Sequence, residues 1–203
     1  MISKLWQYGK YGILGGISGV LLISVDRVLI KHFLGINELG IYSAYSTASI
    51  MVAMQFSWII SNVLFPFASQ EKSNYILLKK LDRLSLFSFL PCVFVLSIIG
   101  YVALSFFGKD YPINYLLIVS MSIYGTSHLI YLVYSSVISS GGPQWIFFST
   151  RHSIIFGVIY LLSVSFLLPQ IGIFAPATAF MLSMIYLIFI RYTLYSNPEF
   201  SKS

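Results

Sequence analysis

Long stretches without a charged side chain are the feature that most limits what this chain can fold into. From Leu39 to Gln70, and again from Tyr111 to Thr150, no Asp, Glu, Lys or Arg interrupts the sequence. Of the 203 residues, 58% are apolar and only 9% are charged, whereas about a quarter are charged in an ordinary soluble domain. Such a chain cannot cover itself with polar surface, which excludes a soluble enzyme, a disordered tail and a coiled coil.

The same stretches have the length of membrane-spanning helices. A hydrocarbon core of about 30 Å requires roughly 20 apolar residues in a helix. The sequence predicts six such spans, and Gly141-Gly142-Pro143 separates the fourth from the fifth. The predicted spans are residues 11–34, 39–70, 84–108, 111–140, 144–168 and 170–190, with a basic loop over 71–83. Because no stretch shows the alternation of membrane β-strands, we expect an all-α integral membrane protein with a single six-helix bundle.

The distribution of lysine and arginine predicts the orientation of these spans. With a cytoplasmic N-terminus, nine of the 12 basic residues fall on the cytoplasmic side: Lys4, Lys10, Lys72, Lys79, Lys80, Arg83, Arg151, Arg191 and Lys202. The positive-inside rule therefore places both termini in the cytoplasm. The 71–83 loop either only fixes this topology or lies as a helix on anionic headgroups. We interpret the net charge of +6 as this topology signal and expect no nucleic-acid partner.

Motifs for catalysis and cofactor binding are missing from the sequence. It contains no GxGxxG, P-loop, HExxH or CxxC motif, and no predicted loop is long enough for a catalytic domain. The single cysteine, Cys92, excludes a disulfide framework and a thiolate metal cluster. We therefore expect a protein that is not an enzyme and has no cofactor and no metal centre.

Ionisable side chains within the first predicted span are candidates for a functional site, because such groups are costly inside a membrane. Ser24, Arg27 and Lys31 follow at steps of three and four, so they share a helix face and form a cationic stripe. Asp26 points about 100° away from Arg27 and needs either a partner on another helix or a proton. Asp26 is therefore either part of a buried interhelical ion pair or a substrate or proton site.

The fourth predicted span carries a polar stripe. Tyr124, His128, Tyr131 and Ser135 recur at steps of four, three and four, which places them on one helix face. A lipid-facing helix would not need these groups, and His128 is the side chain best suited to respond to protons. The alternative is that His128 only forms a hydrogen bond with a neighbouring helix.

Weaker polar signals occur in two other spans. In the second span, Gln55, Trp58 and Asn62 form a similar stripe. In the fifth span, Arg151 lies close enough to the inner membrane surface for its side chain to reach water. None of these signals is specific by itself.

Several segments resemble one known family. Asp26-Arg27-Val28-Leu29-Ile30, Phe33-Leu34-Gly35 and Glu38-Leu39-Gly40-Ile41-Tyr42-Ser43 are similar to a segment of the polysaccharide-biosynthesis flippases. These are the Wzx-type translocases of O-antigen and capsule repeat units in the MOP superfamily, related to the MATE exporters. Val63-Leu64-Phe65-Pro66 and Leu168-Pro169-Gln170-Ile171-Gly172-Ile173 resemble later segments of the family in the same order.

The resemblance implies one half of a carrier. Family members have two six-helix bundles around a central cavity, and this chain resembles the second bundle of a MOP- or MATE-like two-bundle transporter. A second six-helix bundle, from a separate chain or a second copy, is then the expected partner, because alternating access requires two bundles. One bundle alone would also leave the face of Tyr124, His128 and Tyr131 in lipid.

The cargo that the resemblance implies is an undecaprenyl-diphosphate-linked oligosaccharide, carried across the inner (cytoplasmic) membrane. The diphosphate of this cargo requires cations in a water-filled cavity. Membrane lipid is the other expected partner, because it surrounds the carrier. The expected substrate-binding residues are Arg27, Lys31, His128 and Arg151, and the expected cavity-lining residues are Asp26, Tyr124, Tyr131, Gln55 and Asn62.

Two other functions remain open from the sequence. The first is one half of a MATE-like cation or drug antiporter, which would use acidic groups such as Asp26. The second is a membrane subunit without transport activity, or a gene remnant.

Overall fold

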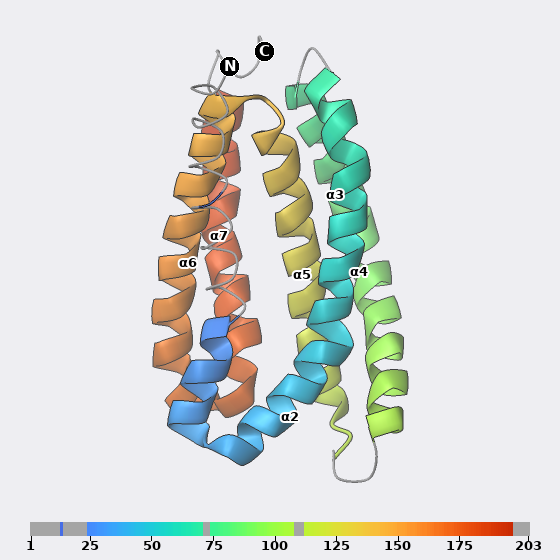
Figure 1. Ribbon diagram of the computed structural model, residues 1–203, viewed down its shortest axis with the longest axis vertical. Coiled ribbons are helices and arrows are strands. Elements are labelled where there is room, and N and C mark those ends of the chain that lie inside the picture. The colour runs from blue at the N-terminus through green and yellow to red at the C-terminus, as the bar shows by residue number, and fades with distance from the viewer. Residues whose placement is uncertain (1–12, 14–23, 71–73, 108–111, 197–203) are drawn as a thin grey trace.

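The computed structural model describes residue 13 and residues 24–70, 74–107 and 112–196. Within these ranges every regular element is helical (Figure 1). The elements are helix 24–34, α2 (Ile36–Ser46), a π-helical segment (Thr47–Met51), α3 (Val52–Gln70), α4 (Asn74–Phe107), α5 (Tyr115–Ser139), α6 (Pro143–Ile171), a 3-10 turn (Gly172–Phe174) and α7 (Ala175–Ser196).

Four helical ranges in the described chain are long and apolar enough to cross a membrane: Ile36–Gln70, Ile76–Phe107, Tyr115–Ser139 and Pro143–Tyr192. The last range comprises α6 and α7, which reverse direction at the 3-10 turn and run side by side (Figure 1). Large apolar side chains such as Leu86 (77% exposed) and Phe106 (84% exposed) cover the outside, as a lipid-facing surface requires. The prediction of an all-α membrane protein is confirmed.

The number of spans stays a prediction. Residues 24–34 of the first predicted span are helical, but most of its remaining residues lie outside the described ranges. The cytoplasmic position of the termini and of the basic segment likewise stays a prediction.

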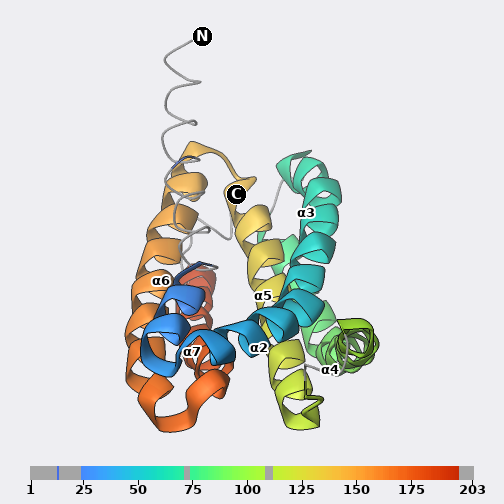
Figure 2. The same ribbon diagram turned by 60° about the horizontal axis from the view of Figure 1, so that its bottom comes forward.

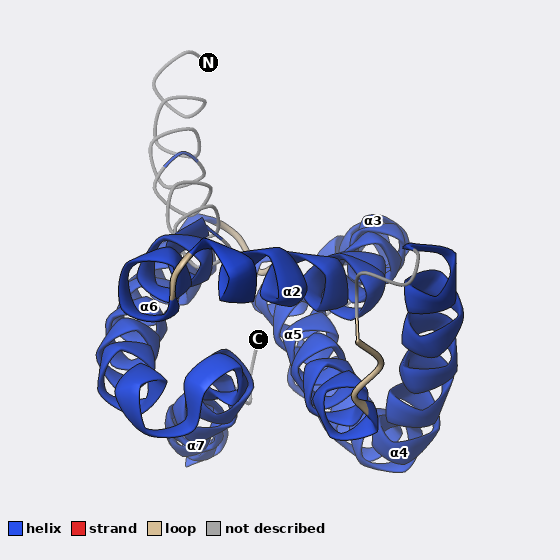
Figure 3. Cartoon of the chain, turned by 90° about the horizontal axis from the view of Figure 1, so that it is seen from below, coloured by secondary structure: helices blue, strands red, loops and turns tan. Residues whose placement is uncertain are grey.

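Helix α5 lies at the centre of the bundle. Helices α3 and α4 pack on one side of it and α6 and α7 on the other, while α2 crosses at one end (Figures 2 and 3). One buried apolar cluster joins helix 24–34 with α2, α5, α6 and α7, through residues such as Ile30, Met121, Phe156 and Phe180. A second cluster joins α4, α5 and α7, through residues such as Leu78, Val137 and Ile190.

Local sequence explains where several helices begin and turn. Asn114 caps α5, because its Oδ1 accepts hydrogen bonds from two backbone amides of the first turn at 3.0 and 3.2 Å. Pro143 is the first residue of α6, where its missing N–H breaks no helical hydrogen bond. Gly142 and Gly172 have φ angles of +110° and +59°, which L side chains rarely adopt, and they permit the turns at the two ends of α6.

Two glycines bring α4 and α5 close to the π-helical segment between α2 and α3. A Cβ atom on Gly125 would lie 3.2 Å from both the Ala53 Cβ and the Ser49 carbonyl oxygen. A Cβ atom on Gly100 would lie 3.0 Å from the Ser49 Oγ. Small residues therefore allow these helices to meet at the point where the π-helical segment interrupts the regular helix.

Helix boundaries differ from the sequence prediction at several points. The sixth predicted span covers 170–190, whereas α7 begins only at Ala175, after the 3-10 turn, and continues to Ser196. The sequence predicts a loop over 71–83, whereas residues 74–83 are the first turns of α4, because Leu78 and Leu81 are buried against the bundle. Helix α6 continues through Pro169 to Ile171 instead of ending near the proline. Helix α5 begins only at Tyr115, after residues 112–114, which form no regular element.

Candidate functional site

The carboxylate of Asp26 is the centre of a buried polar cluster. Asp26 on helix 24–34 is 2% exposed. The Tyr42 hydroxyl donates to Asp26 Oδ2 at 2.7 Å, and the Tyr160 hydroxyl donates to Oδ1 at 2.5 Å. The Tyr124 hydroxyl donates to Oδ2 at 3.3 Å and lies 2.9 Å from the Tyr160 hydroxyl. We call these four residues the Asp26 cluster, and it joins helix 24–34 to α2, α5 and α6.

Among the described residues, three tyrosine hydroxyls are the hydrogen-bond partners of Asp26, and no cation forms an ion pair with it. An ionised carboxylate only accepts hydrogen bonds, so three hydroxyl donors suit it. Tyr42 and Tyr160 are not among the residues predicted from the sequence. Tyr42 lies within the segment that resembles the polysaccharide-biosynthesis flippases, which was its available signal. Tyr160 lies 134 positions from Asp26 in an apolar stretch, so no local pattern connects the two.

The polar stripe of α5 is buried within this bundle. Tyr124, His128 and Tyr131 share a face, as predicted, but they are only 3%, 4% and 8% exposed. The face packs on Phe180 of α7, whose ring centroid lies 4.7 Å from that of Tyr124 and 5.4 Å from that of His128. Phe156 of α6 stacks on Tyr131 with a centroid distance of 4.9 Å. The expectation that a lone bundle leaves this face in lipid is therefore wrong.

The predicted cations do not converge on one site. Arg27 is half-buried next to Asp26, while His128 lies in the aromatic interior described above. Four further predicted residues lie on the outside of the described bundle: Lys31, Gln55, Asn62 and Arg151. The fold therefore brings Asp26 and Tyr124 into contact and places His128 and Tyr131 along the same face, but it separates the remaining candidates.

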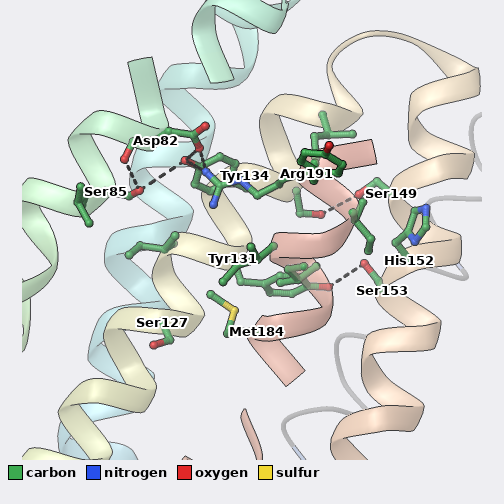
Figure 4. Close-up of a pocket in the computed structure, with 18 of the residues that line it drawn as sticks. Asp82, Ser85, Ser127, Tyr131, Tyr134, Ser149, His152, Ser153, Met184 and Arg191 are labelled. Carbon is green, nitrogen blue, oxygen red and sulfur yellow. Dashed lines mark hydrogen bonds and ion pairs between the residues drawn. The ribbon is translucent and has the colours of Figure 1, made fainter. Parts of the chain in front are cut away.

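A second polar site lies in a cavity of about 600 Å³ between α4, α5, α6 and α7 (Figure 4). We call it the α4–α7 cavity. Its volume is within the range of about 300–1,000 Å³ that is typical of small-molecule sites. Polar residues on its wall include Asp82, Ser85, Ser127, Tyr131, Tyr134, Ser149, His152, Ser153 and Arg191.

An ion pair between Asp82 of α4 and Arg191 of α7 lies at this cavity. The Tyr134 hydroxyl of α5 donates to Asp82 Oδ1 and accepts a hydrogen bond from Arg191 Nη2 (Figure 4). The guanidinium carbon also lies 4.1 Å from the centroid of the Tyr134 ring, a cation–π geometry. The side chains of Arg191 and Asp82 remain 29% and 30% exposed, so molecules within the cavity can reach both charges.

The side of the cavity formed by α6 carries hydroxyl groups and an imidazole. Tyr131 donates to Ser153 Oγ at 2.7 Å, and the hydroxyls of Ser135 and Ser149 lie 2.9 Å apart. The Nδ1 of His152 lies 2.7 Å from the Tyr186 hydroxyl. These groups can exchange hydrogen bonds with a polyhydroxylated ligand. Among the described residues, no three His, Cys, Asp or Glu side chains are grouped to hold a metal ion.

Asp82, His152 and Arg191 were not predicted as site residues from the sequence. Asp82 lies in the segment predicted as a loop. Arg191 directly follows the last predicted span and counts in the sequence only as one of the basic residues that indicate orientation. The signal available for Asp82 was an acidic residue among Lys79, Lys80 and Arg83. Its pairing with Arg191 depends on how α4 and α7 pack around α5.

Comparison with protein families identifies the relationship of this chain. The sequence model described as polysaccharide biosynthesis protein matches residues 1–113, which is more than half of the chain. The chain belongs to this polysaccharide biosynthesis protein family. The match includes Asp26 and Asp82 and confirms the resemblance to the polysaccharide-biosynthesis flippases. No curated protein and no solved structure matches the chain.

Proposed function

We propose that this chain supplies one six-helix bundle of a flippase for surface polysaccharide biosynthesis. The carrier moves undecaprenyl-diphosphate-linked oligosaccharide repeat units across the cytoplasmic membrane. The observation that carries the proposal is a cavity between the helices of a polysaccharide biosynthesis protein, whose largely apolar wall holds an ion pair and several hydroxyl groups.

The chemistry of the α4–α7 cavity suits such a cargo. Ser149, Ser153 and His152 offer hydrogen-bonding groups for sugar hydroxyls. Arg191 offers a guanidinium, the side chain whose planar donors fit phosphate oxygens in pairs. Apolar residues of α4 and α7 complete the wall, which suits the lipid portion of the cargo.

The proposal includes a second six-helix bundle, either a separate chain or a second copy of this one. Alternating access requires two bundles that move about a site between them. Lys31, Arg151, Gln55 and Asn62 are exposed and are therefore available to a surface that faces the second bundle. In this arrangement both termini are cytoplasmic and the protein resides in the inner membrane.

The antiporter alternative has less support. A MATE-like exporter needs a carboxylate that is open to a cation. Both oxygens of Asp26 already accept hydrogen bonds from tyrosine hydroxyls inside the bundle.

Deletion of the coding sequence in the host tests the proposed function. We expect surface polysaccharide to fall and the lipid-linked repeat unit to accumulate in the inner leaflet, because synthesis continues while translocation stops. Lipid extraction, and labelling of outer-leaflet glycan in intact spheroplasts, measure the two quantities. Loss of the lipid-linked unit itself would indicate an enzyme of its synthesis, and an unchanged glycan would support a remnant. Either result would refute the proposal, and re-expression of the chain is the control.

A further inference from the structure

The α4–α7 cavity opens toward the surface of the bundle between α4 and α7. Three of its lining residues are strongly exposed: Leu86 of α4 (77%), Ile188 of α7 (63%) and Tyr192 of α7 (73%). By contrast, Ser127 and Tyr131 of the central helix α5 are 1% and 8% exposed. The exposed residues therefore form a rim on α4 and α7, and the buried residues form the floor on α5.

Polarity in this cavity changes from the rim to the interior. The exposed rim residues Leu86 and Ile188 are aliphatic and continue the lipid-facing surface of the bundle. The Asp82–Arg191 pair and the hydroxyl groups of α5 and α6 also line the cavity (Figure 4), and the Asp82 and Arg191 side chains are less exposed than the rim, at 30% and 29%. An amphiphile can place a polar headgroup inside such a cavity while its apolar chain stays at the rim.

Arg191 already holds an anion in this cavity, namely the Asp82 carboxylate. A phosphate group presents the same oxygen pattern to a guanidinium and can bind it through two parallel hydrogen bonds. Tyr134 would keep its position under the guanidinium, because the cation–π contact does not depend on Asp82. A phosphate can therefore replace the Asp82 carboxylate without rebuilding the site.

We propose that the α4–α7 cavity binds the diphosphate headgroup of an isoprenoid lipid, with Arg191 as its anion contact and Asp82 as the group that it displaces. The lipid reaches the cavity laterally between α4 and α7. Displacement of Asp82 breaks an ion pair between α4 and α7, which belong to opposite sides of α5. This inference rests on the proposed function for its choice of lipid, but headgroup binding is measured separately from transport.

Photocrosslinking in nanodiscs tests the proposal. The full chain is placed in phosphatidylcholine nanodiscs with a photoactivatable polyprenyl diphosphate, and the crosslinking yield is measured against the amount of lipid. We expect labelled peptides from both sides of the rim, around Leu86 and Ile188. Arg191→Gln should weaken binding by about tenfold or more, and Arg191→Lys by about threefold, because lysine keeps the charge but loses the planar fork.

The two partners of the ion pair give opposite predictions. Asp82→Asn removes the competing anion and should tighten binding by about twofold to fivefold. The double variant Asp82→Asn/Arg191→Gln removes both charges of the pair together, so it should fold and still fail to bind. Arg83→Gln is the matched control, because it removes one exposed positive charge of α4 outside the cavity lining and should leave binding unchanged.

Two results would overturn the inference: crosslinking that does not respond to Arg191→Gln, or weaker binding by Asp82→Asn. Competition by polyprenol, which has no phosphate, would also overturn it. Equal competition by phosphatidylglycerol would assign the cavity to bilayer phospholipid and refute the diphosphate lipid. Normal glycan in the deletion strain would refute the proposed function and leave the binding result standing, so the two failures are distinguishable.

Discussion

Replacement of Tyr160 by phenylalanine isolates the contribution of the Asp26 cluster to stability. Tyr160 is fully buried, and its hydroxyl donates to Asp26 Oδ1 at 2.5 Å. Phenylalanine keeps the ring, whose centroid lies 5.8 Å from that of Phe180, so the substitution removes little packing. It leaves a buried carboxylate with one donor fewer. We therefore expect Tyr160→Phe to lower the free energy of unfolding by about 1.5–3 kcal/mol, the range for hydrogen bonds to charged groups.

Tyr131→Phe is the matched control. Tyr131 belongs to the same aromatic interior, but its hydroxyl donates to a neutral acceptor, Ser153 Oγ, at 2.7 Å. The loss should be about 1 kcal/mol, because no charge is left unsatisfied. In an Asp26→Asn background, the cost of Tyr160→Phe should also fall to about 1 kcal/mol, since the acceptor is then a neutral amide.

Unfolding in mixed micelles with increasing denaturing detergent, followed by intrinsic fluorescence, measures these differences. The unmodified chain, Asp26→Asn, Tyr160→Phe and the double variant are compared at one protein concentration and one pH. Equal costs for Tyr160→Phe and Tyr131→Phe would refute the reasoning that a charged acceptor lies at the centre of the cluster. A Tyr160→Phe cost that does not change with Asp26→Asn would refute it as well.

Two further predictions concern packing and topology. Gly125→Val should lower the free energy of unfolding by about 1–3 kcal/mol, because even a Cβ atom at this position would lie 3.2 Å from the Ser49 carbonyl oxygen. Gly40→Ala is the control in the same unfolding assay. A Cβ atom on Gly40 would have no neighbour within 4 Å, so this variant should not destabilise the fold. An equal loss for both would contradict the close approach. Reporter fusions at Lys80 and at the C-terminus should be cytoplasmic and those at Asn37 and Gln170 external, and an external Lys80 would overturn the orientation.

Membrane class, helical structure and family could all be predicted from the sequence. Each depends on a property of a continuous segment: the length of an uncharged run, the absence of strand alternation, or a motif such as the one that begins at Asp26. Lipid imposes these properties on every crossing segment, whatever its neighbours are. The local pattern also placed Tyr124, His128 and Tyr131 on one face of a helix.

Which side chains meet is a property of the tertiary structure alone. The partners of Asp26 lie 16, 98 and 134 positions away, and no local pattern relates such distances. The α5 stripe is buried because Phe180 of α7 packs on it. The Asp82–Arg191 ion pair forms because of the way α4 and α7 lie around α5. A helix face has the same residues whether it meets lipid, water or another helix. The sequence by itself therefore determined that this chain forms membrane helices with polar groups inside them, and the packing of those helices decided which polar groups form a site.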